Sequence, residues 1–269
     1  METHIDSRSV VSPRAELGEN VSVGPFTIVE ENVTIGDGTT IGAHAMIAWG
    51  TRIGKQCKIH SGAVLGTIPQ DLKFHGEETT LEIGDRTTVR EFATLNRGTE
   101  DRWKTIIGSN CLLMSYVHIA HDCILGEHVI LANAINLGGH VTIDDHVIVG
   151  GMTPIHQFVT IGRHVMIGGG FRVPKDVPPY ILAAQEPLSF EGLNIVGLKR
   201  RNFSREAIES LEKAYGLLYD SNLNVSQAVI KIKNEVPMTP EVQHVIEFIE
   251  NSKRGIIGSR RREMPVRTD

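Results

Sequence analysis

Residues 125–166 divide into seven hexads that each begin with an aliphatic side chain: LGEHVI, LANAIN, LGGHVT, IDDHVI, VGGMTP, IHQFVT and IGRHVM. The same six-residue period extends over residues 5–65, 83–95 and 107–173. An α-helix repeats its apolar stripe about every 3.6 residues, so a period of six excludes helices from these segments. The repeat, rather than any single residue, decides the fold of this part of the chain.

Hexads of this kind predict a parallel β-helix, in which each hexad is a short strand followed by a turn. Three hexads complete one triangular coil. Each aliphatic side chain then points inward and stacks, about 4.8 Å away, on the side chain that opens the corresponding hexad of the next coil. The pattern resembles the left-handed β-helix fold, whose hand is opposite to the usual preference for crossover connections. We therefore expect a mainly β protein.

The three cysteines, Cys57, Cys111 and Cys123, each occupy the fifth position of a hexad. Thr39 and Ala45 fill the same position in other hexads. We interpret the cysteines as small inward-facing side chains rather than as redox groups. Their odd number and the lack of a C-x-x-C pair also argue against a disulfide framework and a zinc knuckle.

The repeat also suggests how the chain is organised. Residues 1–188 are expected to form the left-handed β-helix, with loop insertions at 67–80 and 101–106. Loops on a rigid solenoid are where function is usually placed. Beyond the repeat, Ser204 and the pair Thr239-Pro240 are helix N-terminal signals, so residues 189–269 are expected to form an α-helical C-terminal domain.

Composition excludes several classes of function. The 269 residues carry 27 Lys and Arg against 32 Asp and Glu, a formal net charge of −5. This composition gives no overall positive charge that would attract the phosphate backbone of a nucleic acid. No run of 18 apolar residues could span a bilayer. The N-terminal sequence METHIDSRSVV has neither the basic nor the apolar region of a secretory signal, and we therefore expect a cytoplasmic protein.

The 18-residue coil places several polar side chains on one edge of the prism. They are His118, His121, Asp122, His140, His156 and Gln157. Adding 18 to position 121 gives Gly139, which should lie beside His121 in the next coil. A clustered imidazole and carboxylate indicate general base catalysis, with the carboxylate fixing the imidazole tautomer. Gly139 would let a carbonyl approach the main chain, whose N–H could stabilise an oxyanion.

A second histidine series, His128, His146 and His164, is also spaced by 18 residues. It could be a solvated ladder or a three-histidine metal site. Imidazoles stacked at strand spacing do not converge on one point within a single chain. We therefore expect a solvated ladder and no bound metal.

The motifs at these positions closely resemble those of the UDP-N-acetylglucosamine 3-O-acyltransferase family, which opens lipid A biosynthesis. The resemblance covers essentially the whole chain. It rests on IPQDLK at 68–73, HIAHDC at 118–123, GGH at 138–140, GGM at 150–152, IHQF at 155–158, DVPPY at 176–180, GLN at 192–194 and GLKRR at 197–201.

This resemblance implies transfer of an (R)-3-hydroxyacyl group from acyl carrier protein to the 3-position of UDP-N-acetylglucosamine. The acyl group would arrive on phosphopantetheine, with no further cofactor. His121 would be the general base, Asp122 its orienting partner and the Gly139 amide the oxyanion donor. The family is a homotrimer with sites between adjacent prisms, so the loop 70–73 would serve a neighbour's His121.

The resemblance also assigns binding roles. Gln70, Asp71, Lys73, His118, His140, His156 and Gln157 would line the sugar and pantetheine channel. Asn194, Arg200 and Arg201 would serve the nucleotide end, since arginines suit phosphate oxygens. Gly169 would gauge the length of the acyl chain.

Two residues depart from the family pattern: Val196 stands where the family often has Glu, and Asn96 where it often has His. Four alternatives stay open at this point. They are acyl transfer to a 3-amino UDP-sugar, a related N-acyltransferase of the same pathway, a β-helical carbonic anhydrase, and a non-catalytic β-helix. The related N-acyltransferase normally carries a separate N-terminal domain, for which a repeat starting at Ile5 leaves no room.

Overall fold

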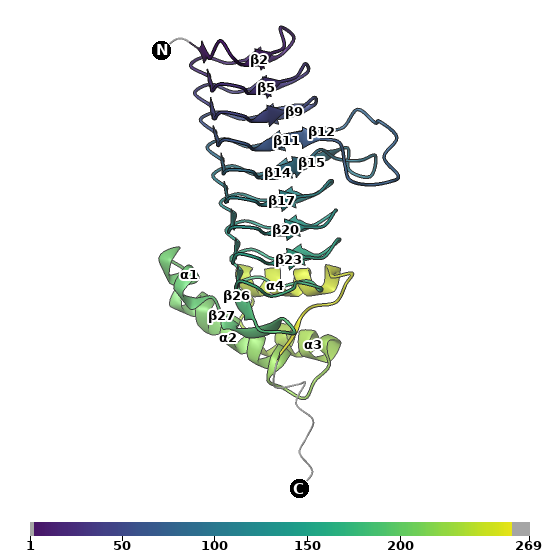
Figure 1. Ribbon diagram of the computed structural model, residues 1–269. Helices are drawn as coiled ribbons and strands as arrows, with labels where there is room; N and C mark the ends of the chain where they lie inside the picture. Colours follow the sequence, from purple (N-terminus) through teal and green to yellow (C-terminus); the bar gives the residue numbers. More distant parts are fainter. Residues whose placement is uncertain (1–2, 260–269) are drawn as a thin grey trace.

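The computed structural model describes residues 3–259 as a triangular prism of parallel strands with helices gathered at one end (Figure 1). Successive strands alternate among three sheets, so each sheet forms one face of a left-handed β-helix. Register follows the 18-residue repeat where the chain is uninterrupted: His118 pairs with Asn136, and Leu113 with Leu131. The hexad prediction of the fold is confirmed.

The strands of the three faces have the following bounds. The first sheet contains β1 (His4–Ile5), β4 (Ser22–Val23), β7 (Thr40–Ile41), β10 (Lys58–Ile59), β13 (Thr88–Val89), β16 (Leu112–Leu113), β19 (Ile130–Leu131), β22 (Ile148–Val149), β25 (Met166–Ile167), β26 (Ile181–Ala184), β27 (Ser189–Leu193) and β28 (Gly258–Ser259). The second contains β2 (Val10–Val11), β5 (Ile28–Val29), β8 (Met46–Ile47), β11 (Val64–Thr67), β14 (Thr94–Asn96), β17 (His118–Ile119), β20 (Asn136–Leu137) and β23 (Pro154–Ile155). The third contains β3 (Glu16–Leu17), β6 (Thr34–Ile35), β9 (Thr51–Ile53), β12 (Thr80–Ile83), β15 (Lys104–Ile107), β18 (Ile124–Leu125), β21 (Thr142–Ile143) and β24 (Thr160–Ile161).

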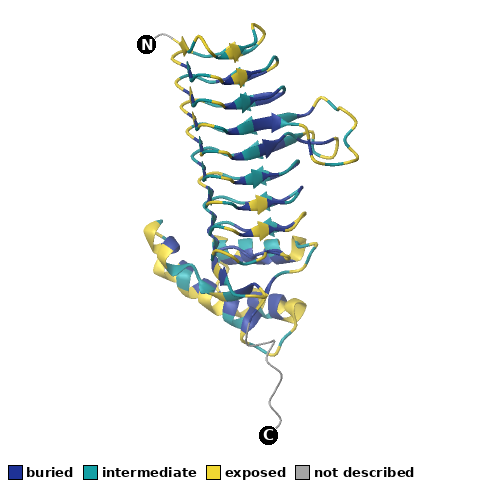
Figure 2. Ribbon diagram, in the orientation of Figure 1, coloured by how far each residue is buried: buried dark blue, intermediate teal, exposed yellow. Residues whose placement is uncertain are grey.

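The prism interior is a stack of aliphatic side chains, one from each hexad. Leu113, Ile119 and Leu125, which open three successive hexads, are all 1% exposed or less. The three cysteines are also buried and free, and burial raises the pKa of Cys123 to about 12. Figure 2 shows buried and more exposed residues side by side along the coils, and many exposed residues in the loop that projects from the prism.

The fourth residue of each hexad turns the corner in the left-handed backbone region. Asp122, His140 and His164 occupy this position with φ values of 58°, 63° and 59°. Asn and Asp adopt this region more readily than most residues, but here the repeat imposes it on histidines and aromatics as well. The corner positions are therefore where polar side chains leave the prism.

The second insertion begins and ends earlier in the sequence than predicted. β15 begins at Lys104, inside the predicted 101–106 segment, because Lys104 and Thr105 pair in register with Thr80 and Leu81 of β12. The loop therefore covers residues 97–103. The first insertion runs from 68 to 79, between β11 and β12, and projects from the side of the prism in Figure 1.

The part of the chain expected to form the α-helical C-terminal domain contains strands as well as four helices among its described residues. β26 continues the first sheet parallel to β25, β27 returns antiparallel, and β28 pairs with β27. The helices are α1 (Ile195–Arg200), α2 (Arg205–Tyr219), α3 (Val225–Glu235) and α4 (Pro240–Asn251). Ser204 and Thr239 are the N-caps of α2 and α4, as the sequence predicts.

Candidate active site

His121 and Asp122 lie in the turn that follows β17, at the corner between the second and third sheets. Nδ1 of His121 lies 2.8 Å from Oδ2 of Asp122. Asp122 is fully buried, and its backbone N–H donates to the hydroxyl of Thr105 at 2.9 Å. The corner turn therefore directs the carboxylate inward beneath the imidazole.

The Asp122 carboxylate is held as an anion. Burial raises its pKa, but hydrogen bonds from His121 and from the side chain and backbone of Thr99 outweigh burial and bring the pKa to about 2. An anionic carboxylate can only accept, so Nδ1 of His121 carries the proton of this hydrogen bond. The lone pair of His121 is thereby left on Nε2, where it can accept a proton from a substrate.

Gly139 and His140 of the next coil complete the cluster. The ring of His140 meets the ring of His121 edge-on at 5.2 Å between centroids, and stacks on Phe158 at 4.5 Å. Burial lowers the pKa of His140, although Asp122 acts in the opposite direction. Within residues 3–259, the N–H of Gly139 donates no hydrogen bond, so it is free to meet an oxyanion.

Two further histidines of the column flank this cluster. His118 lies on β17, with Nδ1 2.8 Å from the hydroxyl of Thr94, and burial lowers its pKa. His156 is exposed, and its Nδ1 bonds to the backbone oxygen of Gln157 at 3.1 Å. His156 also lines a cavity of about 360 Å³ at the last coils. The predicted column is therefore one continuous edge.

The first insertion reaches this edge within the same chain. Oδ2 of Asp71 lies 3.9 Å from Nε2 of His121. Asp71 thus lies near His121 of its own chain, because the loop leaves β11, which lies two strands from β17 in the same sheet and opens at the same corner. The expectation that loop 70–73 serves a neighbour's His121 stays a prediction. Gln70 and Lys73 are exposed, and among described residues no hydrogen bond or ion pair joins their side chains to the histidines.

Asn96 and Arg97 anchor this insertion. The amide of Asn96 donates to the backbone oxygens of Thr67 and Ile68, and Asn96 is only 3% exposed. The guanidinium of Arg97 lies over the rings of both Trp49 and Phe74, at 5.1 and 5.4 Å. Asn96 is thus a buried anchor of the loop.

The residues assigned to the nucleotide end form a separate group. Asn194, Val196, Arg200 and Arg201 line a cavity of about 670 Å³ on the outer face of the first sheet. Asn194 caps α1, with its side chain accepting from Gly197 N and donating to the backbone oxygen of His164. Within one chain, the structure does not bring this group to His121, which lies at the opposite corner.

Gly169 is likewise distant from His121. It lies in the exposed turn after β25, where the first sheet passes into the second. A Cβ atom on Gly169 would lie 3.0 Å from the backbone oxygen of Gly151. The Gly169 turn is therefore narrow on the side of the preceding coil.

The second histidine series is a stacked ladder, but it is not wholly solvated. His128 stacks on His146 at 4.7 Å, and His146 on His164 at 4.8 Å. His164 is only 9% exposed, because Tyr180 and Phe203 cover its ring. Burial lowers the pKa of His164 to about 4. The prediction of a solvated ladder is wrong at this end, where the C-terminal residues fold back onto the prism.

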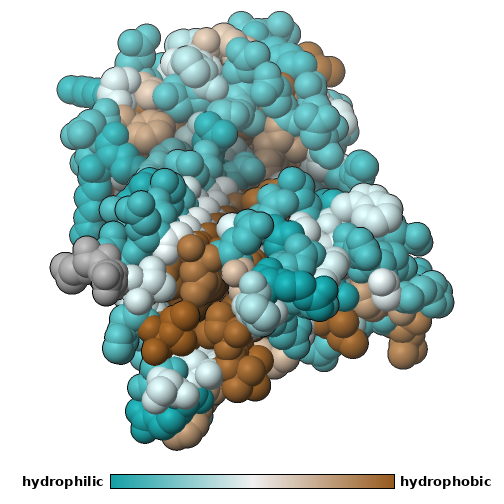
Figure 3. Space-filling model, turned by 90° about the horizontal axis from the view of Figure 1, so that it is seen from above, coloured by the Kyte–Doolittle hydropathy of each residue, from teal (hydrophilic) through white to brown (hydrophobic). Residues whose placement is uncertain are grey.

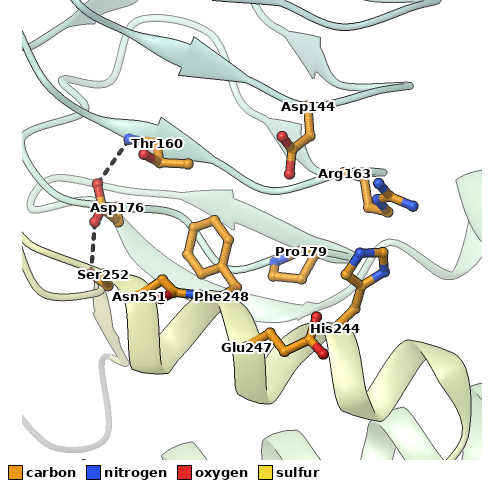
Figure 4. A pocket seen from close by; sticks show the side chains of 10 residues that line it. All are labelled: Asp144, Thr160, Arg163, Asp176, Pro179, His244, Glu247, Phe248, Asn251 and Ser252. Carbon is orange, nitrogen blue, oxygen red and sulfur yellow. Dashed lines mark hydrogen bonds between the residues drawn. The ribbon is translucent and has the colours of Figure 1, made fainter.

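A further cavity of about 240 Å³ lies between the last coils and α4 (Figure 4). No residue that the sequence analysis assigned to a site lines it. Asp176 spans its edge, accepting from Thr160 N at 2.8 Å and from the Ser252 hydroxyl at 2.6 Å. This carboxylate joins the prism to the end of α4.

The sequence analysis missed Thr99, Arg102 and Thr105, which surround Asp122. Arg102 donates to the backbone oxygen of Asp122 at 2.8 Å. Asp122 also lies near His121 and His140 with ligand atoms within 4.8 Å of one another, but three hydrogen bonds already occupy its carboxylate. The available signal was the second insertion itself, which opens at the same corner as His121.

The fold and this site define a transferase built of hexapeptide repeats, with a histidine–aspartate pair at one corner of the prism. Residues 14–48, 32–67 and 104–133 match the family described as bacterial transferase hexapeptide (six repeats), and residues 176–257 match UDP N-acetylglucosamine O-acyltransferase, domain 2. The chain belongs to the acyl-[acyl-carrier-protein]–UDP-N-acetylglucosamine O-acyltransferase family.

Relatives of known name support this membership over nearly the full length. The Chlorobaculum tepidum enzyme of that name is 57% identical over 246 residues, covering 91% of this chain and 93% of that protein. The solved UDP-N-acetylglucosamine acyltransferase of Bacteroides fragilis is 48% identical, with a TM-score of 0.92 over 94% of this chain and 99% of that one. The Acinetobacter baumannii structure gives 45% identity and a TM-score of 0.91 with the same coverage.

Proposed function

We propose that this protein transfers an (R)-3-hydroxyacyl group from acyl carrier protein to the 3-hydroxyl of UDP-N-acetylglucosamine, the first step of lipid A biosynthesis. The acyl group arrives as a thioester on phosphopantetheine, so the reaction needs no other cofactor. The observation that carries the proposal is the His121–Asp122 pair, 2.8 Å apart and with a buried carboxylate. Beside it lies the N–H of Gly139, which donates to no other group among the described residues. A cytoplasmic location agrees with this donor.

The chemistry follows from the free Nε2 of His121. Nε2 takes the proton of the 3-hydroxyl as its oxygen attacks the thioester carbonyl. The carbonyl oxygen becomes an oxyanion, which the N–H of Gly139 stabilises. Collapse of this intermediate breaks the C–S bond, and the imidazolium returns its proton to the leaving thiolate. Asp122 stays ionised throughout and stabilises the imidazolium.

The remaining assigned residues would bind the substrates. Asp71 lies close enough to Nε2 of His121 to accept from a second sugar hydroxyl while His121 accepts from the reacting one. The other members of the sugar and pantetheine channel are Gln70, Lys73, His118, His140, His156 and Gln157. The guanidinium groups of Arg200 and Arg201 suit the diphosphate, and Asn194 holds the start of their helix.

A homotrimer would bring together the His121 corner and the nucleotide-binding residues Arg200 and Arg201. His121 and the Arg200–Arg201 cavity lie on different sides of one prism, so a second copy is needed to bring the nucleotide end of one chain to the His121 corner of another. Phe92, Tyr116 and Met152 offer a surface for such contact, since they occupy equivalent corner positions and are 53%, 61% and 74% exposed. Hydrophobic side chains also gather in one region when the prism is seen from its end (Figure 3).

The test is incubation with UDP-N-acetylglucosamine, its 3-amino analogue and a set of 3-hydroxyacyl carrier proteins, scored by product mass. We expect one acyl group to be added to UDP-N-acetylglucosamine. Product from the 3-amino analogue alone would move the acceptor from oxygen to nitrogen. The absence of product with every donor would overturn the proposal.

A further inference from the structure

We infer that Thr99 is a positioning residue for the reaction: its hydroxyl and backbone N–H fix the Asp122 carboxylate, and through it the ring of His121. The inference rests on the proposed function of His121 as the base. Thr99 belongs to the second insertion, the loop 97–103, whose place in the molecule is otherwise unexplained.

Thr99 donates hydrogen bonds to both carboxylate oxygens of Asp122. Its N–H donates to Oδ1 at 3.0 Å, and its hydroxyl donates to Oδ2 at 2.6 Å. Oδ2 is also the oxygen that accepts from Nδ1 of His121 at 2.8 Å. Thr99 is 7% exposed and Asp122 is fully buried, so water does not compete for these bonds. Hydrogen bonds to a buried ionised group are the strong kind.

Thr99 restricts the side-chain torsion of Asp122. The backbone of Asp122 is already fixed, because its N–H donates to Thr105 and its carbonyl oxygen accepts from Arg102. What remains is rotation of the carboxylate, which would turn Oδ2 away from the imidazole. Donors on both oxygens prevent that rotation, and the β-branched Thr99 has few rotamers to offer as an alternative.

Loop 97–103 is itself held by the ends of the first insertion. Arg97 N donates to the backbone oxygen of Thr67, and Gly98 N donates to that of Thr80, both at 3.1 Å. The hydroxyl of Thr79 donates to the backbone oxygen of Gly98 at 2.6 Å. Thr99 is therefore fixed by the first insertion and bonds to Asp122, so it acts on His121 through Asp122.

Removing the Thr99 hydroxyl has a chemical consequence as well as a geometric one. This donor shares the negative charge of Asp122, so its loss leaves more of that charge to stabilise the protonated imidazole of His121. The base would then stay protonated to higher pH. The other charged or titratable groups that face this pair are constant between variants: Asp71, Asp101, Arg102, His118 and His140.

The experiment compares three variants in the acyl-transfer assay across a pH series. Thr99→Val keeps the shape and the N–H but removes the hydroxyl donor, and Thr99→Ser keeps the donor. Thr27→Val is the control: it removes a buried hydroxyl that donates to the backbone oxygen of Gly42, in a coil remote from Asp122. We expect Thr99→Val to lower kcat by about 10- to 100-fold with KM within about twofold, the scale of a lost orienting partner. Its acid limb of kcat/KM should move to higher pH. Thr99→Ser and Thr27→Val should keep the wild-type limb.

A second measurement does not depend on turnover. In ¹³C-labelled histidine spectra, the signal that disappears in His121→Ala identifies His121, and its titration midpoint should rise in Thr99→Val. If wild type makes no product, the proposed function fails while this titration still tests Thr99. A Thr99→Val protein with wild-type kcat, or with both the acid limb and the midpoint unmoved, overturns the inference.

Discussion

A Cβ atom on Gly139 would lie 2.7 Å from both Cε1 and Nε2 of His121. No real Cβ sits so close to a ring, so the imidazole rests where only a glycine can lie beside it. The substitution Gly139→Ala should push the ring off its hydrogen bond to Asp122. Because about 1 Å of misplacement can cost about 10²-fold in rate, we expect kcat to fall by about that factor.

Gly151→Ala is the matched control, because Gly151 occupies the same position two hexads later, in the turn after β22 at a different corner of the prism. Its Cβ would meet the backbone oxygen of Asn133 at 3.0 Å rather than a catalytic side chain. Steady-state kinetics of both variants distinguish displacement of His121 from general crowding of the prism. Equal losses of kcat would show that crowding of the prism, not displacement of His121, is responsible.

His121→Ala should remove nearly all turnover and leave the fold intact. General base catalysis typically supplies about 10²- to 10⁴-fold, and no other histidine lies on the same hydrogen bond to Asp122. His128→Ala, at the exposed start of the ladder, serves as the control and should retain wild-type kcat. Retention of more than about a tenth of the rate in His121→Ala would rule out His121 as the base.

Sequence spacing predicts those parts of the site that lie on uninterrupted coils. Adding 18 to His121 finds Gly139, and the structure brings the two together because no residue is inserted between them. Subtracting 18 from Asp122 instead gives Lys104, whereas the residue that holds its carboxylate is Thr99. The second insertion breaks the register there, so the repeat carries no information about which loop residue reaches the carboxylate.

Contacts made where the chain folds back onto the prism also cannot be predicted from the six-residue repeat. The covering of His164 by Phe203 depends on how the C-terminal residues fold back, which a hexad pattern cannot specify. The same holds for Asn96, whose buried contacts with the first insertion follow from the path of that loop. Spacing therefore predicts the column of histidines, and tertiary packing decides which of them are buried.

Asp176→Ala should destabilise the junction between prism and helices. Asp176 is 2% exposed and accepts from both Thr160 N and the Ser252 hydroxyl. Loss of a buried charged acceptor costs about 1.5–3 kcal/mol per hydrogen bond, so the free energy of unfolding should fall by at least about 2 kcal/mol. Denaturant unfolding at fixed protein concentration measures the change.

Asp145→Ala is the matched control for that junction. Asp145 accepts from Glu127 N at 2.8 Å in the same coil-to-coil manner, but its side chain is 43% exposed. Its loss should cost less than about 1 kcal/mol. If the two variants lose equal free energy of unfolding, Asp176 contributes no more to stability than an exposed corner aspartate such as Asp145.

His164 should make stability depend on pH. Burial, followed by the charges of His146 and Arg201, lowers its pKa in the folded protein to about 4, below an ordinary value of 6.5. Between these two pH values the unfolded chain binds a proton that the folded chain does not. Stability is therefore fully present above about pH 6.5 and falls as the pH approaches about 4, with a loss of about 2 kcal/mol at pH 5.

His164→Phe removes this titration and keeps a stackable ring. Phe158 shows that phenylalanine adopts the same corner conformation, with φ of 64°. The variant should lose about 2 kcal/mol less stability than wild type between pH 7 and pH 5, measured by denaturant unfolding at each pH. Parallel pH curves for the two proteins would contradict the assignment to His164.

Gly169→Met tests whether this turn gauges the acyl chain. The acyl chain of the proposed reaction needs an apolar groove between prisms, and the exposed Gly169 turn is closed by Gly151 on the side of the preceding coil. A methionine there must therefore project away from the prism, into the space that a long acyl chain would use. Wild type should prefer a long 3-hydroxyacyl donor, and Gly169→Met a shorter one.

The size of the shift follows from the burial of methylene groups. Each buried methylene contributes about 0.8 kcal/mol, so a donor two carbons too long should lose about 15-fold in kcat/KM relative to the donor that fits. Competition between carrier proteins bearing different acyl chains, scored by product mass, gives this ratio directly. Gly216→Met, where a Cβ meets nothing within 4 Å in α2, controls for the added side chain and should leave the donor ranking unchanged. If Gly169→Met is folded and active but keeps the wild-type ranking, the far end of the acyl groove is closed by another residue.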